Sequence, residues 1–186
     1  MRPPRQAGKD AFSTQPDRPC PPRPEQLIAC LNSLGIKTET IEHPPLYTVE
    51  DSKKLRGAVP GGHAKNLFVK DKKSRLFLLS LEEHAQVDLK RVHELIGAQG
   101  RVSFGQAELL MEVWGVTPGS VTPFGAINDK DKRVSVILEK TLMAHERVNF
   151  HPLTNTRTTG LKSADLITFL KAVRHEPKII AFAQAG

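Results

Sequence analysis

Residues 61–81 constrain the fold of this chain more than any other segment. Two adjacent glycines lead into an apolar run over residues 65–70, and a second apolar run covers residues 75–81. The polar residues between the two runs have the composition of a tight turn, so the segment predicts a β-hairpin. It also places Lys65 where a glycine-containing loop becomes a strand, a position at which a side chain can be held at a fixed angle to a ligand.

Apolar spacing elsewhere predicts a mixture of helices and strands. We expect helices over residues 24–31, 88–96, 106–113 and 163–174, a short helix opened by a capping box at 48–51, and strands over 36–42, 133–138, 147–150 and 156–159. Residues 115–125 contain too many glycines and prolines for regular structure. Helices at both ends of a set of hairpin-like strands, without strict alternation of strand and helix, predict an α+β domain.

The start of the chain differs in composition from the rest. Residues 1–24 contain seven of the fourteen prolines and almost no aliphatic side chains. Such a segment buries too little surface to offset the entropy of ordering it. We therefore expect a disordered tail over residues 1–23 and one folded domain over residues 24–186.

Several compartments and cofactors are disfavoured by composition. No apolar run approaches the roughly 20 residues that span a bilayer, and the basic start has no apolar segment behind it that would make a secretory signal. The cysteines, Cys20 and Cys30, are too few for a disulfide framework and lack a zinc-binding spacing, and the histidines show none either. We expect a cytoplasmic protein without a metal ion or other cofactor and without a membrane partner.

Positive charge is concentrated in one part of the chain. The formal net charge is +7, and residues 53–75 hold eight basic residues against one acid, Asp71. The basic residues are Lys53, Lys54, Arg56, Lys65, Lys70, Lys72, Lys73 and Arg75. This pattern fits a polyanionic partner, and the alternative is a solvated lysine-rich face.

Common catalytic motifs are absent. Residues 57–63 have the glycine spacing of a phosphate-binding loop, but His63 stands where that loop needs lysine. The sequence has no G-x-S-x-G elbow, no H-E-x-x-H motif and no dinucleotide fingerprint. The enzyme classes that remain position an already reactive substrate instead of attacking it with a protein nucleophile.

Three places in the chain are candidates for such a site, and each has a structural alternative. Lys65 and Asn66 begin the first apolar run, where a lysine can also be an edge charge and an asparagine can bind backbone. The loop from Gly119 to Pro123 offers backbone amides to a ligand, or it is an ordinary connection. His151 follows a predicted strand and precedes a proline, where a histidine commonly has only a structural role.

Taken together, four segments in this order resemble the YbaK/prolyl-tRNA synthetase-associated domain family, over roughly residues 24–183. They are E-H-P-P with Y-T-V-E at residues 42–50, G-H-A-K-N-L-F at 62–68, G-V-T-P-G-S-V-T-P-F at 115–124 and F-H-P-L-T-N at 150–155. Within that family the chain is most similar to the free-standing deacylases that act on Ala-tRNA(Pro). The resemblance implies a single mixed, mainly antiparallel sheet with flanking helices.

The resemblance also implies an activity and a set of site residues. The expected activity is hydrolysis of alanine from tRNA(Pro) that prolyl-tRNA synthetase has mischarged, so the expected partners are the acceptor end of tRNA(Pro) and that synthetase, and not DNA. Lys65, Gly119 and His151 carry over as catalytic residues. Residues that would contact the substrate are Pro45, Tyr47, Asn66, Ser120, Pro123 and Phe124, and residues that would contact tRNA are Lys53, Lys54 and Arg56.

Elementary chemistry makes this activity reasonable for such a residue set. An aminoacyl ester is already activated, so its hydrolysis needs a placed water and a stabilised oxyanion more than a nucleophilic side chain. We expect Lys65 to anchor the terminal phosphate or ribose, because a lysine near solvent is protonated at neutral pH. Alanine fits inside a pocket built for proline, so a second site that sterically rejects proline corrects the error.

Two other functions fit the same sequence. A relative with the same fold could remove cysteine or another small amino acid, since pocket size does not follow from the loop residues. A non-catalytic tRNA-binding or synthetase-associated module would keep the basic surface but would not depend on Lys65.

Overall fold

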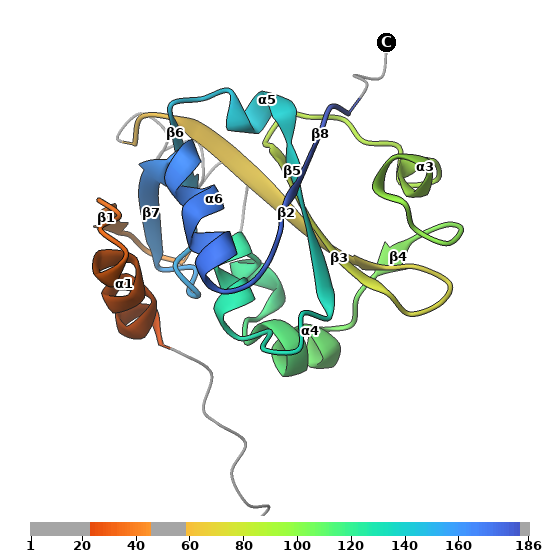
Figure 1. Cartoon of the computed structure of the whole chain (residues 1–186), viewed down its shortest axis with the longest axis horizontal. Coiled ribbons are helices and arrows are strands. Elements are labelled where there is room, and N and C mark those ends of the chain that lie inside the picture. Colours follow the sequence, from red (N-terminus) through yellow and green to blue (C-terminus); the bar gives the residue numbers. More distant parts are fainter. Residues whose placement is uncertain (1–22, 46–58, 183–186) are drawn as a thin grey trace, which may run out of the picture.

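The computed structural model describes residues 23–45 and 59–182, and these form one mixed sheet with helices on both faces (Figure 1). The strand order is β1-β7-β6-β2-β3-β5-β8, and β4 pairs with β2 beside this path. The strands are β1 (Glu39–Glu42), β2 (Gly62–Lys70), β3 (Leu76–Glu82), β4 (Ser103–Phe104), β5 (Val134–Glu139), β6 (Arg147–Phe150), β7 (Arg157–Lys162) and β8 (Lys178–Ile180). The pairs β1–β7, β6–β7, β2–β3 and β2–β4 are antiparallel, and the pairs β2–β6, β3–β5 and β5–β8 are parallel.

The predicted hairpin lies at the centre of this sheet. β2 and β3 pair from Ala64 with Glu82 to Lys70 with Leu76, and both follow the apolar runs seen in the sequence. β3 is buried along nearly its whole length because it lies between β2 and β5. A strand that is covered on both faces needs a continuous apolar run, and the sequence supplies one.

The two faces of the sheet are covered by different elements. On one face, α1 (Pro24–Ser33), α4 (Ala107–Trp114) and α6 (Ser163–Ala172) pack with the sheet around a large core. On the other face, the segment between β3 and β4, with α3 (Val92–Ile96), packs over a smaller core. Alternate residues of β2 and β3 serve the two cores, as a pleated strand requires: Phe68 and Leu78 contribute to the first core, and Val69 and Leu79 to the second.

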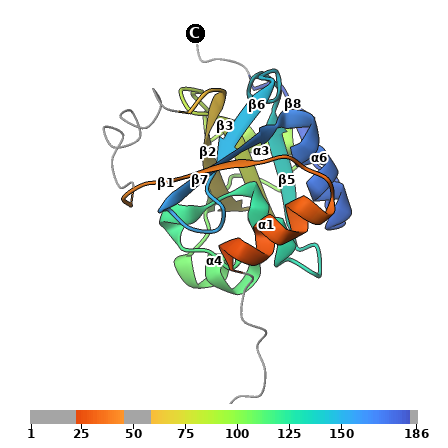
Figure 2. The ribbon, with the colours of Figure 1, turned by 90° about the vertical axis from the view of Figure 1, so that its left-hand side faces the viewer.

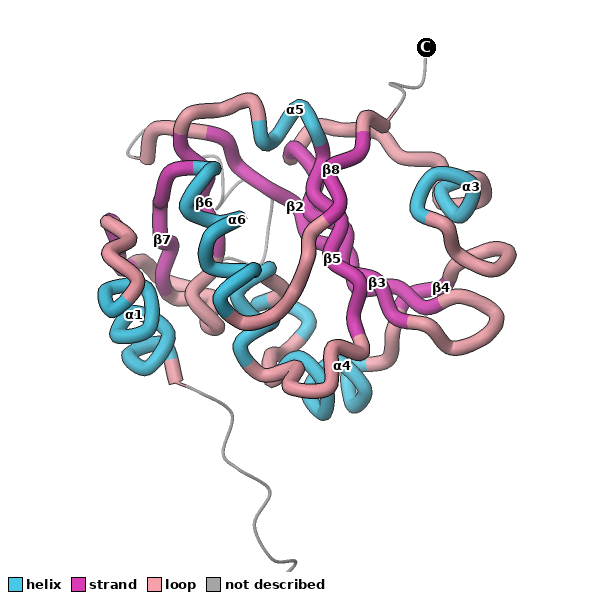
Figure 3. The backbone as a smooth tube through the Cα atoms, in the orientation of Figure 1, coloured by secondary structure: helices cyan, strands magenta, loops and turns pink. Residues whose placement is uncertain are grey.

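The remaining helical pieces are short. α5 (Lys140–Met143) directly follows β5, and two 3₁₀ turns, η1 (Pro118–Ser120) and η2 (Pro123–Ile127), lie between α4 and β5. The smooth trace in Figure 3 shows α3 and β4 together at one end of the sheet and α1 at the other end. No helix in the described ranges is long and apolar enough to cross a bilayer.

The predicted fold class is confirmed, but several element boundaries differ from the sequence prediction. The strand expected at 36–42 begins only at Glu39, and the helix expected at 88–96 begins at Val92, because Asp88 instead forms a turn with the amides of Lys90 and Arg91. Ser163 does not cap α6 with its side chain. The short helix expected near residues 48–51 lies outside the described residues, as do residues 1–22 of the expected tail.

Candidate functional site

Lys65 lies near the start of β2 with its side chain half-buried. Its Nζ donates a hydrogen bond to the carbonyl oxygen of Ala85, in the segment that follows β3. This segment is itself tied to the sheet, because the amide of Glu83 donates to the carbonyl of His63 at 2.9 Å. The ammonium group is therefore held by a backbone oxygen and does not extend freely into solvent.

A buried carboxylate supports the segment that holds Lys65. Glu139, at the end of β5, is only 3 % exposed, and its Oε2 accepts a hydrogen bond from the amide of Glu82 at 2.5 Å. The carbonyl of Glu82 in turn accepts from the amide of Ala85 at 2.9 Å. Glu139 thus fixes the end of β3, where the turn from Glu82 to Ala85 begins. The carbonyl of Ala85, at the end of this turn, binds Lys65.

Lys65 lies on β2, and His151 is the residue directly after the neighbouring parallel strand β6. β2 and β6 pair at His63 with Asn149, and Lys65 and His151 each lie two residues farther along. Residues two apart on a strand share a face, so Lys65 lies on the face of the sheet opposite the large core, and the alternation of β6 continued by one residue assigns His151 to the same face. Beyond this point β2 pairs with β3 and β4, while β6 ends, so the sheet opens between the two residues.

The hydrogen bond of His151 defines which ring nitrogen carries the proton. Its Nδ1 lies 3.0 Å from the carbonyl oxygen of Arg157, which can only accept, so Nδ1 is protonated and Nε2 holds the lone pair of the neutral ring. Burial lowers the pKa of His151, nearby His43 lowers this pKa further, and the Arg157 carbonyl opposes the shift. The neutral ring with an acceptor Nε2 is therefore the form present at neutral pH.

His43 adds a second imidazole to this region. Its ring centroid is 6.2 Å from that of His151, and its Nε2 lies 2.9 Å from Oγ1 of Thr158 on β7. Its Nδ1 lies 2.8 Å from the carbonyl of Pro44, so the ring is fixed at the end of β1. His43, Thr158 and Glu139 are not among the site residues predicted from the sequence, because their positions depend on strand pairing across the sheet.

The loop that contains Gly119 lies against the segment that follows His151. A Cβ atom built on Gly119 would be 3.5 Å from Nδ2 of Asn155, and Gly119 is exposed in the η1 turn. The loop is anchored by Trp114, whose Nε1 donates to the carbonyl of Thr122 at 2.6 Å. Gly125 passes directly over the Trp114 ring, where a Cβ atom would be only 2.1 Å from Cδ1.

The other predicted site residues are divided between the surface and the interior. Asn66 lies on the face opposite Lys65, and its Oδ1 accepts from the hydroxyl of Ser80 at 2.6 Å. Phe124 is fully buried, with its ring edge-on to both Phe150 and Phe169, so it supports the wall behind the loop from within the core. Ser120 and Pro123 are buried and Pro45 is exposed, whereas Tyr47, Lys53, Lys54 and Arg56 lie outside the described residues.

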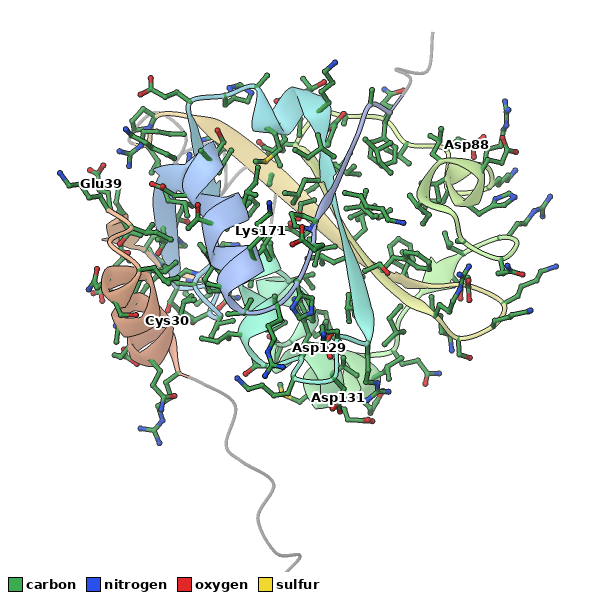
Figure 4. All side chains as sticks on the ribbon, in the orientation of Figure 1. Cys30, Glu39, Asp88, Asp129, Asp131 and Lys171 are labelled. Carbon is green, nitrogen blue, oxygen red and sulfur yellow. The ribbon has the colours of Figure 1, made fainter. Side chains whose placement is uncertain are left out.

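A separate buried pair lies behind the loop. His175 Nε2 is 3.1 Å from Oδ2 of Asp129, and the carboxylate also accepts from the amides of Arg133 and Val134. Although burial opposes it, these hydrogen bonds lower the pKa of Asp129. Figure 4 shows Asp129 at the base of the domain, where this pair fastens the end of η2 to the segment after α6. In the described part of the chain, no group of three or more His, Cys, Asp or Glu side chains is arranged to hold a metal ion.

The chain matches a family of known domains. Residues 43–169, a range that includes Lys65, Gly119 and His151, match the family described as the aminoacyl-tRNA editing domain. The chain is 35 % identical over 161 residues to the prolyl-tRNA synthetase associated domain-containing protein 1 of Mus musculus, covering 84 % of this chain and 95 % of that protein. It is 34 % identical over 149 residues to the prolyl-tRNA editing protein ProX of Acetoanaerobium sticklandii, covering 80 % and 90 %.

Solved structures agree with this match at the level of the fold. A crystal structure described as that of a candidate trans-editing enzyme for prolyl-tRNA synthetase superposes with a TM-score of 0.65 at 17 % identity, covering 86 % of this chain and 97 % of that one. The hypothetical protein APE2540 gives the same TM-score at 15 % identity, covering 83 % and 97 %. The chain belongs to the aminoacyl-tRNA editing domain family, and the resemblance inferred from its motifs is confirmed.

Proposed function

We propose that this protein is a trans-editing deacylase that hydrolyses the ester of Ala-tRNA(Pro) released by prolyl-tRNA synthetase. The observation that carries the proposal is the matched placement of Lys65 on β2 and of His151 directly after the parallel strand β6, with the Gly119 loop against the segment that follows His151. The three residues come from distant parts of the sequence, and each is the residue that the family motifs single out. A setting in the cytoplasm, where free aminoacyl-tRNA occurs, is part of this proposal.

The contacts of Lys65 support a role in binding the 3′ end of tRNA. Its Nζ is an ammonium group with three N–H donors, and one of them donates to the carbonyl oxygen of Ala85. Among the described residues no other hydrogen bond of this group is seen, so its other donors can bind the terminal phosphate or ribose, and charge-assisted bonds of this kind are about twice as strong as neutral ones. The lysine therefore acts as an anchor and a source of positive charge, and not as a base.

His151 supplies a hydrogen-bond acceptor, whereas Lys65 supplies donors. With Nδ1 bound to the Arg157 carbonyl, Nε2 can accept a hydrogen bond from the α-ammonium group or from the free ribose hydroxyl of the terminal adenosine. Each of these contacts orients the ester relative to Lys65. Because burial keeps the ring neutral, the acceptor persists at neutral pH.

The hydrolysis itself requires no protein nucleophile. A water oxygen forms a bond to the ester carbonyl carbon, and the bond from this carbon to the ribose oxygen breaks. One proton of the water is transferred to the departing ribose oxygen, and the free hydroxyl beside it is placed to relay that proton. Backbone amides of the Gly119 loop are the proposed donors to the oxyanion, a function that is worth about 10²–10³-fold in rate in other hydrolases.

One assay tests this proposal against its alternatives. Ala-, Cys- and Pro-tRNA(Pro) are offered to the wild type, to Lys65→Ala and to Lys178→Ala, which removes an exposed strand lysine from β8. We expect rapid release of alanine, little release of proline and a loss of about 10²-fold in Lys65→Ala, because an ester that is no longer anchored is misplaced relative to the attacking water. Lys178→Ala should match the wild type.

The other outcomes identify the other functions. A preference for the cysteinyl substrate would assign the protein to deacylation of Cys-tRNA(Pro). Binding of tRNA without release of any amino acid, in the wild type and in Lys65→Ala alike, would make it a non-catalytic tRNA-binding or synthetase-associated module.

A further inference from the structure

At the tip of the β2–β3 hairpin the acidic side chain, Asp71, is buried, whereas the basic side chains are exposed. The carboxylate of Asp71 is buried and accepts hydrogen bonds from the amides of Lys73, Arg75 and Gln99 at 2.8–2.9 Å, and from Nε of Arg75 at 2.8 Å. Against the cost of burial, these donors lower the pKa of Asp71 to about 2. The negative charge of Asp71 is therefore neutralised by donors within and beside the turn, and its carboxylate is not exposed at the surface.

A second segment lies along the same hairpin. Arg75 Nη2 donates to the carbonyl of Gly97 at 2.8 Å, the side chain of Lys72 lies against Gly100, and Ser103 pairs with Lys70. Arg101 is exposed in the middle of this segment. The result is a group of five basic side chains, the hairpin patch, which consists of Lys70, Lys72, Lys73, Arg75 and Arg101.

The charge of the hairpin patch is largely uncompensated by its own segments. Residues 70–75 and 97–104 contain no acid other than Asp71. At the opposite end of the sheet the arginines are paired with exposed acids: Arg147 lies 3.1 Å from Glu39, and Arg157 lies 2.9 Å from Glu25. Figure 4 labels Glu39 at the edge farthest from the hairpin tip. Cations gathered around a single buried acid favour a polyanion over a charged protein surface of mixed sign.

An exposed aromatic side chain lies next to these cations. Phe104 on β4 is 59 % exposed, the most exposed of the large apolar side chains in the described ranges, and it pairs with Val69. On its other side Val69 pairs with Phe77, and the Arg75 guanidinium lies 5.7 Å from the centre of the Phe77 ring. A directly opposed pair shares a face of the sheet, so Phe104 lies on the same side as Val69 and Lys65. Aromatic side chains among basic ones are typical of surfaces that bind unpaired nucleotides, because every base has a face that stacks.

The hairpin patch and the candidate site are joined by a single strand. Lys65 and Lys70 are five residues apart on β2, which corresponds to about 17 Å in an extended strand, and Phe104, which pairs with Val69, lies on the same face as Lys65. Figure 1 shows the hairpin extending past the body of the sheet, beside α3 and β4, and Figure 2 shows α1 and β1 crossing the opposite end. A tRNA acceptor arm whose 3′ end lies at Lys65 is long enough to contact both places.

We propose that the hairpin patch is a second contact surface for the acceptor arm of tRNA, in which the five cations bind the phosphate backbone and Phe104 stacks on an unpaired base. The identity of the RNA rests on the proposed function, whereas the chemistry of the surface, phosphates beside a base, does not. The surface would keep the substrate bound while the reactive end is positioned at Lys65 and His151.

Direct binding of uncharged tRNA(Pro) tests this surface without any hydrolysis. Fluorescence anisotropy of labelled tRNA is measured from 50 to 200 mM KCl with the wild type and with a triple variant, Lys72→Glu, Lys73→Glu and Arg101→Glu. Loss of three phosphate contacts should weaken binding at least tenfold at 50 mM and reduce the slope of log K against log salt by about 2–3. The matched control reverses three exposed lysines elsewhere, Lys37→Glu, Lys140→Glu and Lys162→Glu, with the same change in net charge.

Equal losses in the two triple variants would mean that only net charge matters and would overturn the proposal, as would an unchanged Kd and slope in the hairpin variant. Phe104→Ala should weaken binding by roughly fivefold or more with an unchanged salt slope, and no effect would remove the stacking contact from the proposal. Circular dichroism of each variant serves as the control for folding and should match that of the wild type.

A comparison of substrates separates this proposal from the proposed function. The hairpin variant should hydrolyse a short alanyl ester of adenosine as the wild type does, and should lose activity only on full-length tRNA. If the wild type hydrolyses no ester at all, the proposed function fails, and the anisotropy result still decides on the surface.

Discussion

Lys65 on β2 and His151, directly after the neighbouring parallel strand β6, are each two residues beyond the pair of His63 with Asn149. One offers an ammonium held by the carbonyl of Ala85, and the other offers a neutral imidazole held by the carbonyl of Arg157. A donor and an acceptor are thus fixed by backbone oxygens on either side of the place where the sheet opens. Because backbone carbonyls hold both side chains, substitutions that move the carbonyl of Ala85 or Arg157 should lower activity, as substitutions of Lys65 or His151 should.

Glu139 should support catalysis through the turn that holds Lys65. In Glu139→Ala the amide of Glu82 loses its acceptor, the turn through Ala85 loosens, and the ammonium group is no longer held in place. We expect kcat for alanyl-tRNA to fall by about 10–100-fold, since misplacement of a site by about 1 Å has effects of this size. Glu139→Gln keeps an acceptor oxygen and should recover most of the rate.

The two variants together distinguish positioning from stability. Urea unfolding should show that Glu139→Ala remains folded under assay conditions, at a cost of about 1–3 kcal/mol for the unsatisfied amide. Full kcat in Glu139→Ala, or equal losses of kcat in Glu139→Ala and Glu139→Gln, would contradict a positioning role.

The protonation state of His151 should appear in the pH dependence of the reaction. Since burial lowers its pKa below the ordinary value of 6.5, the neutral ring persists on acidification past that value, and kcat/KM should fall only below it. Single-turnover rates between about pH 5 and 8 in the wild type and in His151→Gln check this, because the variant should lack the acid limb. His84→Ala, which removes an exposed histidine, serves as the control and should keep the limb.

Gly119 and Gly125 should respond to alanine in opposite ways. A methyl group at Gly119 finds nothing closer than 3.5 Å, so the free energy of unfolding of Gly119→Ala should stay within about 0.5 kcal/mol of the wild type. Its deacylation rate should nevertheless fall, because the added group lies where the proposed ester approaches the loop. A variant with unchanged rate would remove Gly119 from the site.

Gly125→Ala is the structural counterpart. Its Cβ atom would lie 2.1 Å from two atoms of the buried Trp114 ring, which cannot move without shifting the core. We expect a loss of about 1–3 kcal/mol or more in the free energy of unfolding, measured by urea denaturation. Wild-type stability in this variant would show that the loop is not held against Trp114.

Asp71 should make folding stability depend on acid pH. Its pKa is about 2 in the folded protein, against an ordinary value of 3.8 for an unperturbed aspartate, so the stabilisation is complete above about pH 4 and is lost as the pH falls toward 2. Asp71→Asn should be less stable by about 1–2 kcal/mol at pH 7. Urea midpoints should show this difference shrinking between pH 4 and 2, and a constant difference would contradict the role assigned to the carboxylate.

Much of the architecture was predictable from local pattern. The central hairpin, β5, β6 and the helices at both ends have apolar spacing that identifies them without reference to the rest of the chain. The strand predicted at 156–159 is β7, which extends to Lys162 because it is paired on both sides, by β1 and β6, although its Thr and Gly residues have little apolar character. The short strands β4 and β8 were missed, since each exists only through pairing with a distant strand.

The candidate site also has some features that the local sequence predicts and others that depend on distant contacts. Lys65, Gly119 and His151 stand in recognisable motifs, so the sequence by itself determined which residues to suspect and which family the chain belongs to. Only the tertiary structure decided that Lys65 and His151 share a face, that Phe124 is in the core and that Glu139 supports the turn at Ala85. Those facts depend on contacts between residues far apart in the chain, and a local pattern contains no information about which distant strand will become its neighbour.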